Sequence, residues 1–247
     1  MTSSETTHPI DADLMLSNVI WNSLTGAHAS AAEGSGEVRR YRSEFAPFAA
    51  ARDYTPDNVA ALARMLAPDE RLTLFTLEKP VTPPGYDVVR EASIIQMIGA
   101  RRFEAPTDAR IVTLDAGDAP DMLKLVERTD PGPFRQRTHE LGTFVGIRVD
   151  GELVAMAGER MKAGSYVELS AVCTLPDWRG RGLGTLLMTH LAVAMQQRGE
   201  TPFLHVLSGN LPALRLYEEL GFQRARVFHL TSFAASVTTT ATATASR

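Results

Sequence analysis

The amino-acid sequence predicts an α/β protein, and three observations support the prediction. Apolar residues recur with the two-residue period of strands in some segments and with the three- to four-residue period of helices in others. The chain has 247 residues and is 44% hydrophobic, which suffices for one large domain or two modest ones. Residues 172–185 have the pattern of a strand that turns through a glycine-rich loop into a helix.

Composition and charge argue against several classes of protein. The chain carries 25 basic and 29 acidic residues, a net charge of −4, which argues against a nucleic-acid partner. Cys173 is the only cysteine, so no intrachain disulfide can form, and without Cys/His clusters we expect no metal site. The first residues lack the basic start and apolar stretch of a signal peptide, and no run of about 18 apolar residues predicts a membrane span. We therefore expect a cytoplasmic protein with no membrane partner, whose sequence leaves a homodimer open.

The first part of the chain is predicted to be a smaller α/β domain, residues 1–105. The polar, proline-containing residues 100–108 lie between apolar segments and are the predicted linker, so we place the boundary near Ala105. The predicted elements of this domain are a helix that opens at residue 55 and strands over residues 72–77 and 86–98.

This upstream part carries no catalytic signature. Its conspicuous residues are Trp21, His28 and the basic run 39–42. We interpret them as packed residues and a solvated basic face, without a role in a site.

Residues 106–232 are predicted to form the second domain, in which strands and helices follow one another regularly. Asp150-Gly151 is a strong two-residue hairpin signal between two of the strands. The Thr- and Ala-rich residues 233–247 have nothing to bury and are predicted to be a disordered tail. The predicted strands span residues 111–114, 143–149, 152–161, 166–174, 202–207 and 222–230. The predicted helices span residues 119–128, 183–198 and 211–220, with a short helix that ends near Leu141.

The glycine-rich loop ahead of the helix at residue 183 predicts an anion site. Gly180, Gly182 and Gly184 carry no side chains, so consecutive N–H groups can converge on a phosphate at the positive end of the helix dipole. A Walker A loop is excluded because no lysine follows Gly184. The dinucleotide fingerprint fails because Thr185 stands where its third glycine belongs. A glycine turn with only a structural role is the remaining alternative.

Two patterns resemble the GNAT superfamily of acyl-CoA-dependent N-acyltransferases. The run 179–184, Arg-x-x-Gly-x-Gly, is similar to the pyrophosphate-binding signature of that superfamily, and the run 210–222, Asn-x-x-Ala-x-x-x-Tyr…Gly-Phe, resembles its second block. The resemblance covers residues 107–232 and implies a GNAT fold, a mixed, mostly antiparallel central sheet with flanking helices. Residues 168–182 and 198–205 are in addition similar to the glycine N-acyltransferase-like branch. That branch implies a smaller, divergent GNAT-like α/β domain ahead of the working one.

The resemblance also implies acetyl-CoA as the co-substrate. The alternation of the strand slips at Val172, consistent with the bulge by which family members splay this strand from its parallel neighbour and admit pantetheine. Freed main-chain groups would pair with the pantetheine amides in the manner of a β-strand. The residues implied to hold the co-substrate are Val172, Cys173, Thr174, Arg179, Gly180, Arg181, Gly182, Leu183, Gly184, Thr185, Asn210 and Ala213.

The catalytic roles are also implied by the resemblance. Tyr217 would protonate the departing thiolate, and Glu168 is the candidate general base, with Glu159 in reserve. Each assignment has an alternative: Glu168 as a solvent-facing residue of a half-exposed strand, Tyr217 as a core tyrosine, and Asn210 as a helix cap. We interpret Cys173 as a small apolar residue of a buried strand and not as a nucleophile.

Together these implications predict an enzyme. It would transfer an acetyl group directly from acetyl-CoA to a primary amine of a small molecule or peptide. The alternative is a non-catalytic acyl-CoA-binding or assembly module. The sequence leaves the identity of the acceptor and the preferred acyl-chain length open.

Overall fold

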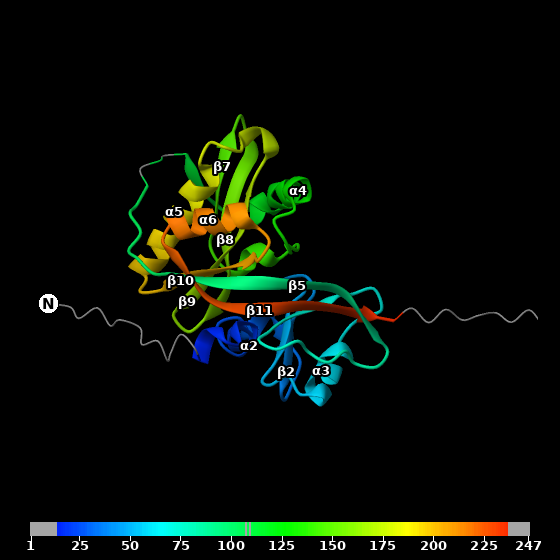
Figure 1. Cartoon of the computed structure of the whole chain (residues 1–247). Coiled ribbons are helices and arrows are strands. Elements are labelled where there is room, and N and C mark those ends of the chain that lie inside the picture. Colours follow the sequence, from blue (N-terminus) through cyan, green and yellow to red (C-terminus); the bar gives the residue numbers. More distant parts are fainter. Residues whose placement is uncertain (1–13, 107, 109, 237–247) are drawn as a thin grey trace, which may run out of the picture.

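The computed structural model describes residues 14–106, 108 and 110–236 of the chain (Figure 1). The α-helices are α2 (Val19–Thr25), α3 (Pro56–Ala63), α4 (Ala119–Thr129), α5 (Leu183–Gln197) and α6 (Leu211–Glu219), and the 3-10 helices are η1 (Ala29–Ala31), η2 (Ala116–Asp118), η3 (Thr138–Leu141) and η4 (Pro176–Trp178). The strands are β1 (Ala32–Glu33), β2 (Val38–Tyr41), β3 (Ala49–Ala51), β4 (Leu72–Thr76), β5 (Tyr86–Gly99), β6 (Ile111–Leu114), β7 (Phe144–Val149), β8 (Glu152–Ala163), β9 (Tyr166–Thr174), β10 (Thr201–Leu207) and β11 (Phe222–Ala235).

Local signals explain where several of these elements begin and turn. The Thr55 side chain accepts a hydrogen bond from the Asn58 N–H, which caps α3 as its sequence predicts. Asp150 and Gly151 adopt φ values of 50° and 85°, the left-handed conformation that a tight hairpin between β7 and β8 requires. Among the described residues, no helix has the length and apolar character needed to cross a membrane.

One large sheet organises the molecule. Its eight strands follow the order β4-β11-β5-β10-β9-β8-β7-β6, and a separate small sheet has the order β1-β2-β3. The pair β9–β10 is parallel, and the other neighbouring pairs of the large sheet are antiparallel. The predicted mixed, mostly antiparallel sheet with flanking helices is therefore confirmed.

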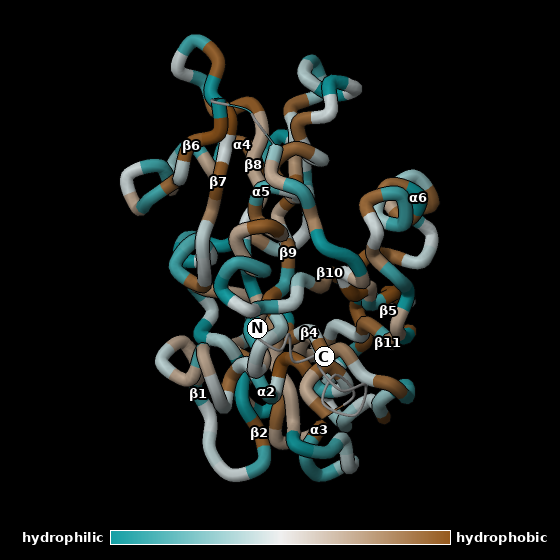
Figure 2. Tube along the Cα trace, turned by 90° about the vertical axis from the view of Figure 1, so that its left-hand side faces the viewer, coloured by the Kyte–Doolittle hydropathy of each residue, from teal (hydrophilic) through white to brown (hydrophobic). Residues whose placement is uncertain are grey.

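Different parts of the chain cover the two faces of this sheet. On one face α5 packs against β8, β9 and β10, while on the other α2 packs against β8. Alternate residues of β10 point to the two cores: Leu204 and Val206 belong to the core under α5, whereas Phe203 packs in the core that contains Phe48 and Phe228. Figures 1 and 2 show α4 and α5 on one side and α2, α3 and β2 on the other. Residues 14–85, the upstream segment, thus supply most of the second cover.

Strand β5, which belongs to the predicted first domain, is part of the large sheet. It lies between β10 and β11, with Gln96 opposite His205 and Ile95 opposite Val227. The predicted linker, residues 100–108, follows β5 and leads to β6, so it connects two strands of one sheet. A polar segment with a proline is typical of an exposed connection. Here the connection joins two strands of the same sheet and does not lie between two separate sheets.

Strand β11 is longer than its sequence predicts. It continues to Ala235 and pairs there with Tyr86 of β5, so the prediction of a disordered tail is wrong for residues 233–235. The apolar pattern weakens toward the end of β11, but pairing with β5 extends the strand regardless. Residues 237–247 of the predicted tail lie outside the described residues.

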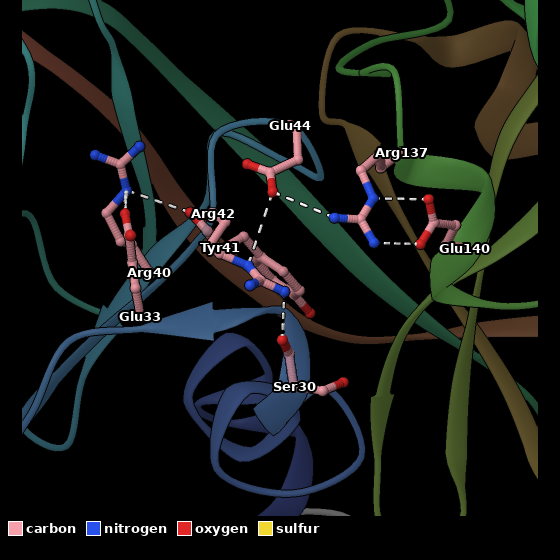
Figure 3. A network of polar contacts seen from close by, with 8 residues as sticks. All are labelled: Ser30, Glu33, Arg40, Tyr41, Arg42, Glu44, Arg137 and Glu140. Carbon is pink, nitrogen blue, oxygen red and sulfur yellow. Dashed lines mark hydrogen bonds and ion pairs between the residues drawn. The ribbon is translucent and has the colours of Figure 1, made fainter.

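The basic run at residues 39–42 is not simply a solvated face. Arg40 is only 5% exposed, and its guanidinium binds Glu70 at 2.7 Å and Glu33 at 3.1 Å. Figure 3 shows that Arg42 and its neighbour Glu44 continue this polar network toward Arg137 of the downstream part. The ion pairs explain how several charges of the upstream segment lie close to its core.

His28 and Trp21 are packed residues, as predicted. The His28 ring is buried, with Nδ1 2.9 Å from the Tyr41 hydroxyl and Nε2 3.0 Å from the Leu141 carbonyl oxygen. Burial lowers the pKa of His28, so the ring is neutral and holds the upstream segment against η3. Trp21 is half-buried beneath the guanidinium groups of Arg39 and Arg52.

A fragment of residues 106–236 is expected not to fold alone. Without β5 the facing edges of β10 and β11 lose their partner, and the apolar face beneath them loses its cover. Circular dichroism during urea denaturation measures this: the whole chain should unfold in a cooperative transition, and the fragment should show none. A cooperative transition of the fragment would contradict this account and support an independent domain after residue 105.

Candidate active site

Strands β9 and β10 separate part-way along their length. Their parallel ladder runs only from the pair Tyr166–Thr201 to the pair Glu168–Phe203. Beyond that point β9 stays paired with β8, and β10 stays paired with β5. The edges of β9 and β10 that face each other are therefore not hydrogen-bonded to one another there. The expected splay of the two strands is confirmed.

A bulge in β9 accompanies the separation. The register with β8 steps from Met156 opposite Cys173 to Gly158 opposite Ser170, so β9 carries one extra residue. Ala171 within this step has φ 51°, in the left-handed region. Such a conformation costs a residue with a Cβ roughly 1–2 kcal/mol. The expected bulge is thus confirmed, and local backbone strain accompanies it.

A cavity of about 400 Å³ opens where the strands diverge. Its lining includes β9 residues Ser170, Ala171 and Val172, α5 residue Met188, and Asn210 and Tyr217 of the α6 region. The upstream segment contributes Phe48, Thr73 and Phe75, β5 contributes Arg90 and Ile94, and the loop after α4 contributes residues 130–133. The cavity therefore joins the downstream site residues to the upstream part of the chain.

The glycine loop ahead of α5 has the conformation that its sequence predicts. Gly180 and Gly182 have φ values of 74° and 72°, which residues with a Cβ rarely adopt. A Cβ at Gly184 would lie 3.5 Å from the Val172 side chain, so the first turn of α5 lies beside the cavity. Among the described residues no side chain caps α5, and the amides of its first turn are open to an anion.

Two arginines flank this loop. Arg179 Nε donates to the Thr174 carbonyl oxygen at 3.2 Å, and Arg181 lies over the Trp178 ring at 4.4 Å. Both guanidinium groups are exposed, so they add positive charge beside the open amides.

Helix α6 brings its two predicted residues to the cavity. The Asn210 side-chain oxygen accepts a hydrogen bond from the Ala213 N–H at 3.2 Å, which confirms the cap, and Asn210 also lines the cavity. Tyr217 lines the same cavity, and burial raises the pKa of its hydroxyl above the usual 10. That hydroxyl makes no hydrogen bond to the part of the chain that the structure describes. It is therefore protonated at neutral pH and can donate to a ligand.

Glu168 lies behind the cavity wall and not in the lining. The alternative of a solvent-facing residue is wrong, because Glu168 is fully buried. Its carboxylate accepts two hydrogen bonds of 2.8 Å from Arg160 and one of 2.8 Å from His205 Nδ1. Burial alone would raise the pKa of Glu168, but the charge of Arg160 and these hydrogen bonds outweigh it and lower the pKa to about 2. A carboxylate so placed is a poor acceptor for the proton of an amine.

Other predicted residues are not in the cavity lining. Glu159, the reserve base, binds Arg198 at 2.7 Å and is not in the cavity lining. Cys173 is buried in the core, and burial raises the pKa of its thiol to about 11, as expected for a small apolar residue and not for a nucleophile. Leu183 is buried as the first anchor of α5, and Thr185 follows in its first turn.

Comparison with known proteins agrees with this geometry. A family model described as FR47-like protein matches residues 144–229. A crystal structure from Novosphingobium aromaticivorans, assigned to the GNAT family, is 40% identical, covers 90% of this chain and 98% of that chain, and superposes with a TM-score of 0.84. The [ribosomal protein bS18]-alanine N-acetyltransferase of Salmonella typhimurium is 30% identical over 127 residues, 47% of this chain and 82% of the relative. Streptothricin acetyltransferase of Streptomyces lavendulae is 33% identical over 82 residues, 32% of this chain and 43% of the relative.

The chain belongs to the GNAT family. Its named relatives are acetyltransferases, and this protein is an N-acetyltransferase, an enzyme that moves an acetyl group to an amine. The alternative of a non-catalytic binding module finds no support. GNAT acetyltransferases use acetyl-CoA as the acetyl donor.

Several residues around this cavity were not predicted from the sequence. His205 and Arg160 line the cavity and hold Glu168, and Phe48 and Phe75 wall it from the upstream segment. The only local signal was a histidine in an otherwise apolar strand. The aromatic walls gave no signal, because the fold brings them from far away in the sequence.

Replacing Glu168 by Gln is expected to lower the free energy of unfolding by about 3–5 kcal/mol, because the buried Arg160 charge loses its partner. The matched control is Glu152→Gln, whose partner Arg128 is exposed, and it should cost at most about 1 kcal/mol. Urea denaturation of both variants measures the difference. Equal losses would contradict the buried ion pair.

Proposed function

We propose that this enzyme takes its acetyl group from acetyl-CoA bound at the divergence of β9 and β10. The diphosphate would lie on the amides of residues 180–185, and the pantetheine arm would enter between the two strands. The observation that carries the proposal is that the open strand edges and Tyr217 line one cavity, and that the glycine loop lies beside its Val172 wall. An amide-bearing arm can replace the missing ladder with hydrogen bonds of its own.

The chemistry of the cavity suits the donor. The strand edges beyond the Glu168–Phe203 pair offer N–H and C=O groups that are not bonded across the gap, and a pantetheine arm carries matching amides. An N–H near Val172, beside the bulge, could stabilise the oxyanion of the attacked carbonyl. Arg179 and Arg181 add positive charge near the diphosphate.

Tyr217 is the proposed acid. A thiolate that leaves needs a proton, and the Tyr217 hydroxyl is protonated, lines the cavity and has no hydrogen-bond partner among the described residues. This supports direct transfer from donor to amine without an acetylated enzyme, since the buried Cys173 is a poor nucleophile.

The acceptor is proposed to be a primary amine of a small molecule or peptide. The relative from Salmonella typhimurium is named as an alanine N-acetyltransferase, and a name that places the acetyl group on a nitrogen supports an amine acceptor. Phe48, Thr73 and Phe75 of the upstream segment wall the cavity, which supports a role for that segment in acceptor binding. We extend this to the finer proposal that residues 1–105 act as the divergent first half of a glycine N-acyltransferase-like protein, supported by the wall they form and by the similarity at residues 168–182.

The Tyr217→Phe variant is expected to lower kcat by about 10²–10⁴-fold, because the general acid is lost, and to leave KM for acetyl-CoA nearly unchanged. The measurement is thiol release from acetyl-CoA with a panel of primary amines. Tyr86→Phe, at the start of β5 and away from the cavity lining, is the matched control and should keep full activity. Full activity of Tyr217→Phe would remove the acid role.

A further inference from the structure

His205 lies at the centre of a polar chain that crosses three strands. Its Nδ1 is 2.8 Å from Glu168 Oε1 on β9, and its Nε2 is 3.1 Å from Gln96 Nε2 on β5. Gln96 is buried and donates its other amide hydrogen to the Leu16 carbonyl oxygen at 3.2 Å. The imidazole itself contributes to the cavity lining.

These hydrogen bonds determine where the ring carries its hydrogen. The Leu16 carbonyl only accepts, so the nitrogen of the Gln96 amide must face it. The same nitrogen then donates to His205 Nε2, which must hold a lone pair. The single hydrogen of the neutral ring is therefore on Nδ1, where it is donated to the Glu168 carboxylate.

The cavity needs a group that can take a proton from the acceptor. An amine of lysine type is protonated at neutral pH, since its ordinary pKa is about 10.4, and it must lose a proton before it can attack. Arg90 and Arg160 stay protonated, and Tyr217 is already protonated. Among the described lining residues this leaves His205 and Asp130.

His205 is the better placed of the two. Asp130 is exposed in the loop after α4, and its carboxylate makes no hydrogen bond or ion pair to the described residues. His205 is held on both ring nitrogens, and its side chain is only 4% exposed. A base that is oriented by a carboxylate behind it is a recurring arrangement in acyl transfer.

We propose that His205 is the general base of this N-acetyltransferase, accepting the acceptor's proton at Nε2, and that the buried Glu168 is its positioning residue. The proposal deepens the proposed function and rests on it. The family resemblance implies Glu168 on β9 as the candidate base, whereas this proposal assigns the role to His205 on the neighbouring strand β10. Glu168 keeps a role by holding the Nδ1 hydrogen and stabilising the imidazolium that forms.

The proton balance closes over the reaction. The acceptor ammonium replaces the Gln96 amide as donor to Nε2, because a charged donor makes the stronger bond, and its N–H bond breaks as Nε2–H forms. The freed lone pair forms the C–N bond to the thioester carbonyl carbon, and the C–S bond breaks with its electron pair on sulfur. Tyr217 gives its proton to that thiolate and recovers one from the nitrogen that becomes the amide. The His205 proton then passes to solvent.

Every element packed against His205 is consistent with a ring that changes charge. The charged groups near it are Glu168 on β9 and, through that carboxylate, Arg160 on β8. Strand β5 contributes the uncharged Gln96. The other neighbours are aromatic rings of β4, β10 and β11: Phe75, Phe203 and Phe228, with centroids 5.1, 5.6 and 5.9 Å from the imidazole. Arg160 and His205 both donate to Glu168 Oε1, and the negative charge of this carboxylate offsets the repulsion between the guanidinium and the imidazolium.

The test compares His205→Asn with His229→Asn, the same change at an exposed histidine of β11. Asn at position 205 can still donate to Glu168 but has no basic nitrogen. The readout is kcat/KM for thiol release from acetyl-CoA, measured against pH with the best amine of the panel. In the wild type kcat/KM should fall at acidic pH, because a general base that already carries a proton cannot accept another. His205→Asn should lose about 10²–10⁴-fold and lose this acidic limb, and His229→Asn should change neither.

Further measurements test Asp130 as an alternative base and locate the hydrogen of the His205 ring. Asp130→Asn should retain the acidic limb, and its loss there would make Asp130 the base. Nitrogen-15 spectra of histidine-labelled wild-type protein should show His205 with its hydrogen on Nδ1 at pH 8. In the Glu168→Gln variant the acidic limb of kcat/KM should move to lower pH, because the imidazolium loses its carboxylate. Unchanged kcat/KM and acidic limb in His205→Asn, or a hydrogen on Nε2 in the wild type, would overturn the proposal. Absence of thiol release from the wild type with every amine would overturn the proposed function itself.

Discussion

The parallel ladder between β9 and β10 ends early, and this early end creates the cavity. After the Glu168–Phe203 pair, β9 stays paired with β8 and β10 stays paired with β5, but β9 and β10 no longer pair with each other. The bulge at Ala171 makes this divergence possible and accepts a left-handed residue to do so. The opened edge faces α5, whose glycine loop begins beside it. In the proposed function, co-substrate binding therefore depends on a missing set of backbone hydrogen bonds as much as on side chains.

The last bonded pair of that ladder also marks a buried ionic centre. Glu168 joins Arg160 on one side and His205 on the other, and all three come from neighbouring strands. Removing these charges from water is costly, and the fold tolerates it because each oxygen of the carboxylate is bonded. The upstream segment covers this face of the sheet, so residues such as Phe48 and Phe75 both complete the core and wall the cavity.

Local signals allowed much of this fold to be predicted from the sequence. The glycine loop, the Asp150-Gly151 hairpin and the Asn210 cap each depend on a few adjacent residues, and the structure has all of them. The place of β5 could not be predicted, because it pairs with strands more than 100 residues away. The burial of Glu168 could not be predicted for the same reason. Its alternation with apolar neighbours is typical of a half-exposed strand, but in the folded protein the upstream segment covers that face.

The decisive measurement is a crystal structure of the protein in complex with CoA. We expect the diphosphate on the main-chain N–H groups of residues 180–185, the pantetheine arm between β9 and β10, and the sulfur within reach of the Tyr217 hydroxyl. CoA bound elsewhere, with the gap between these two strands empty, would contradict it.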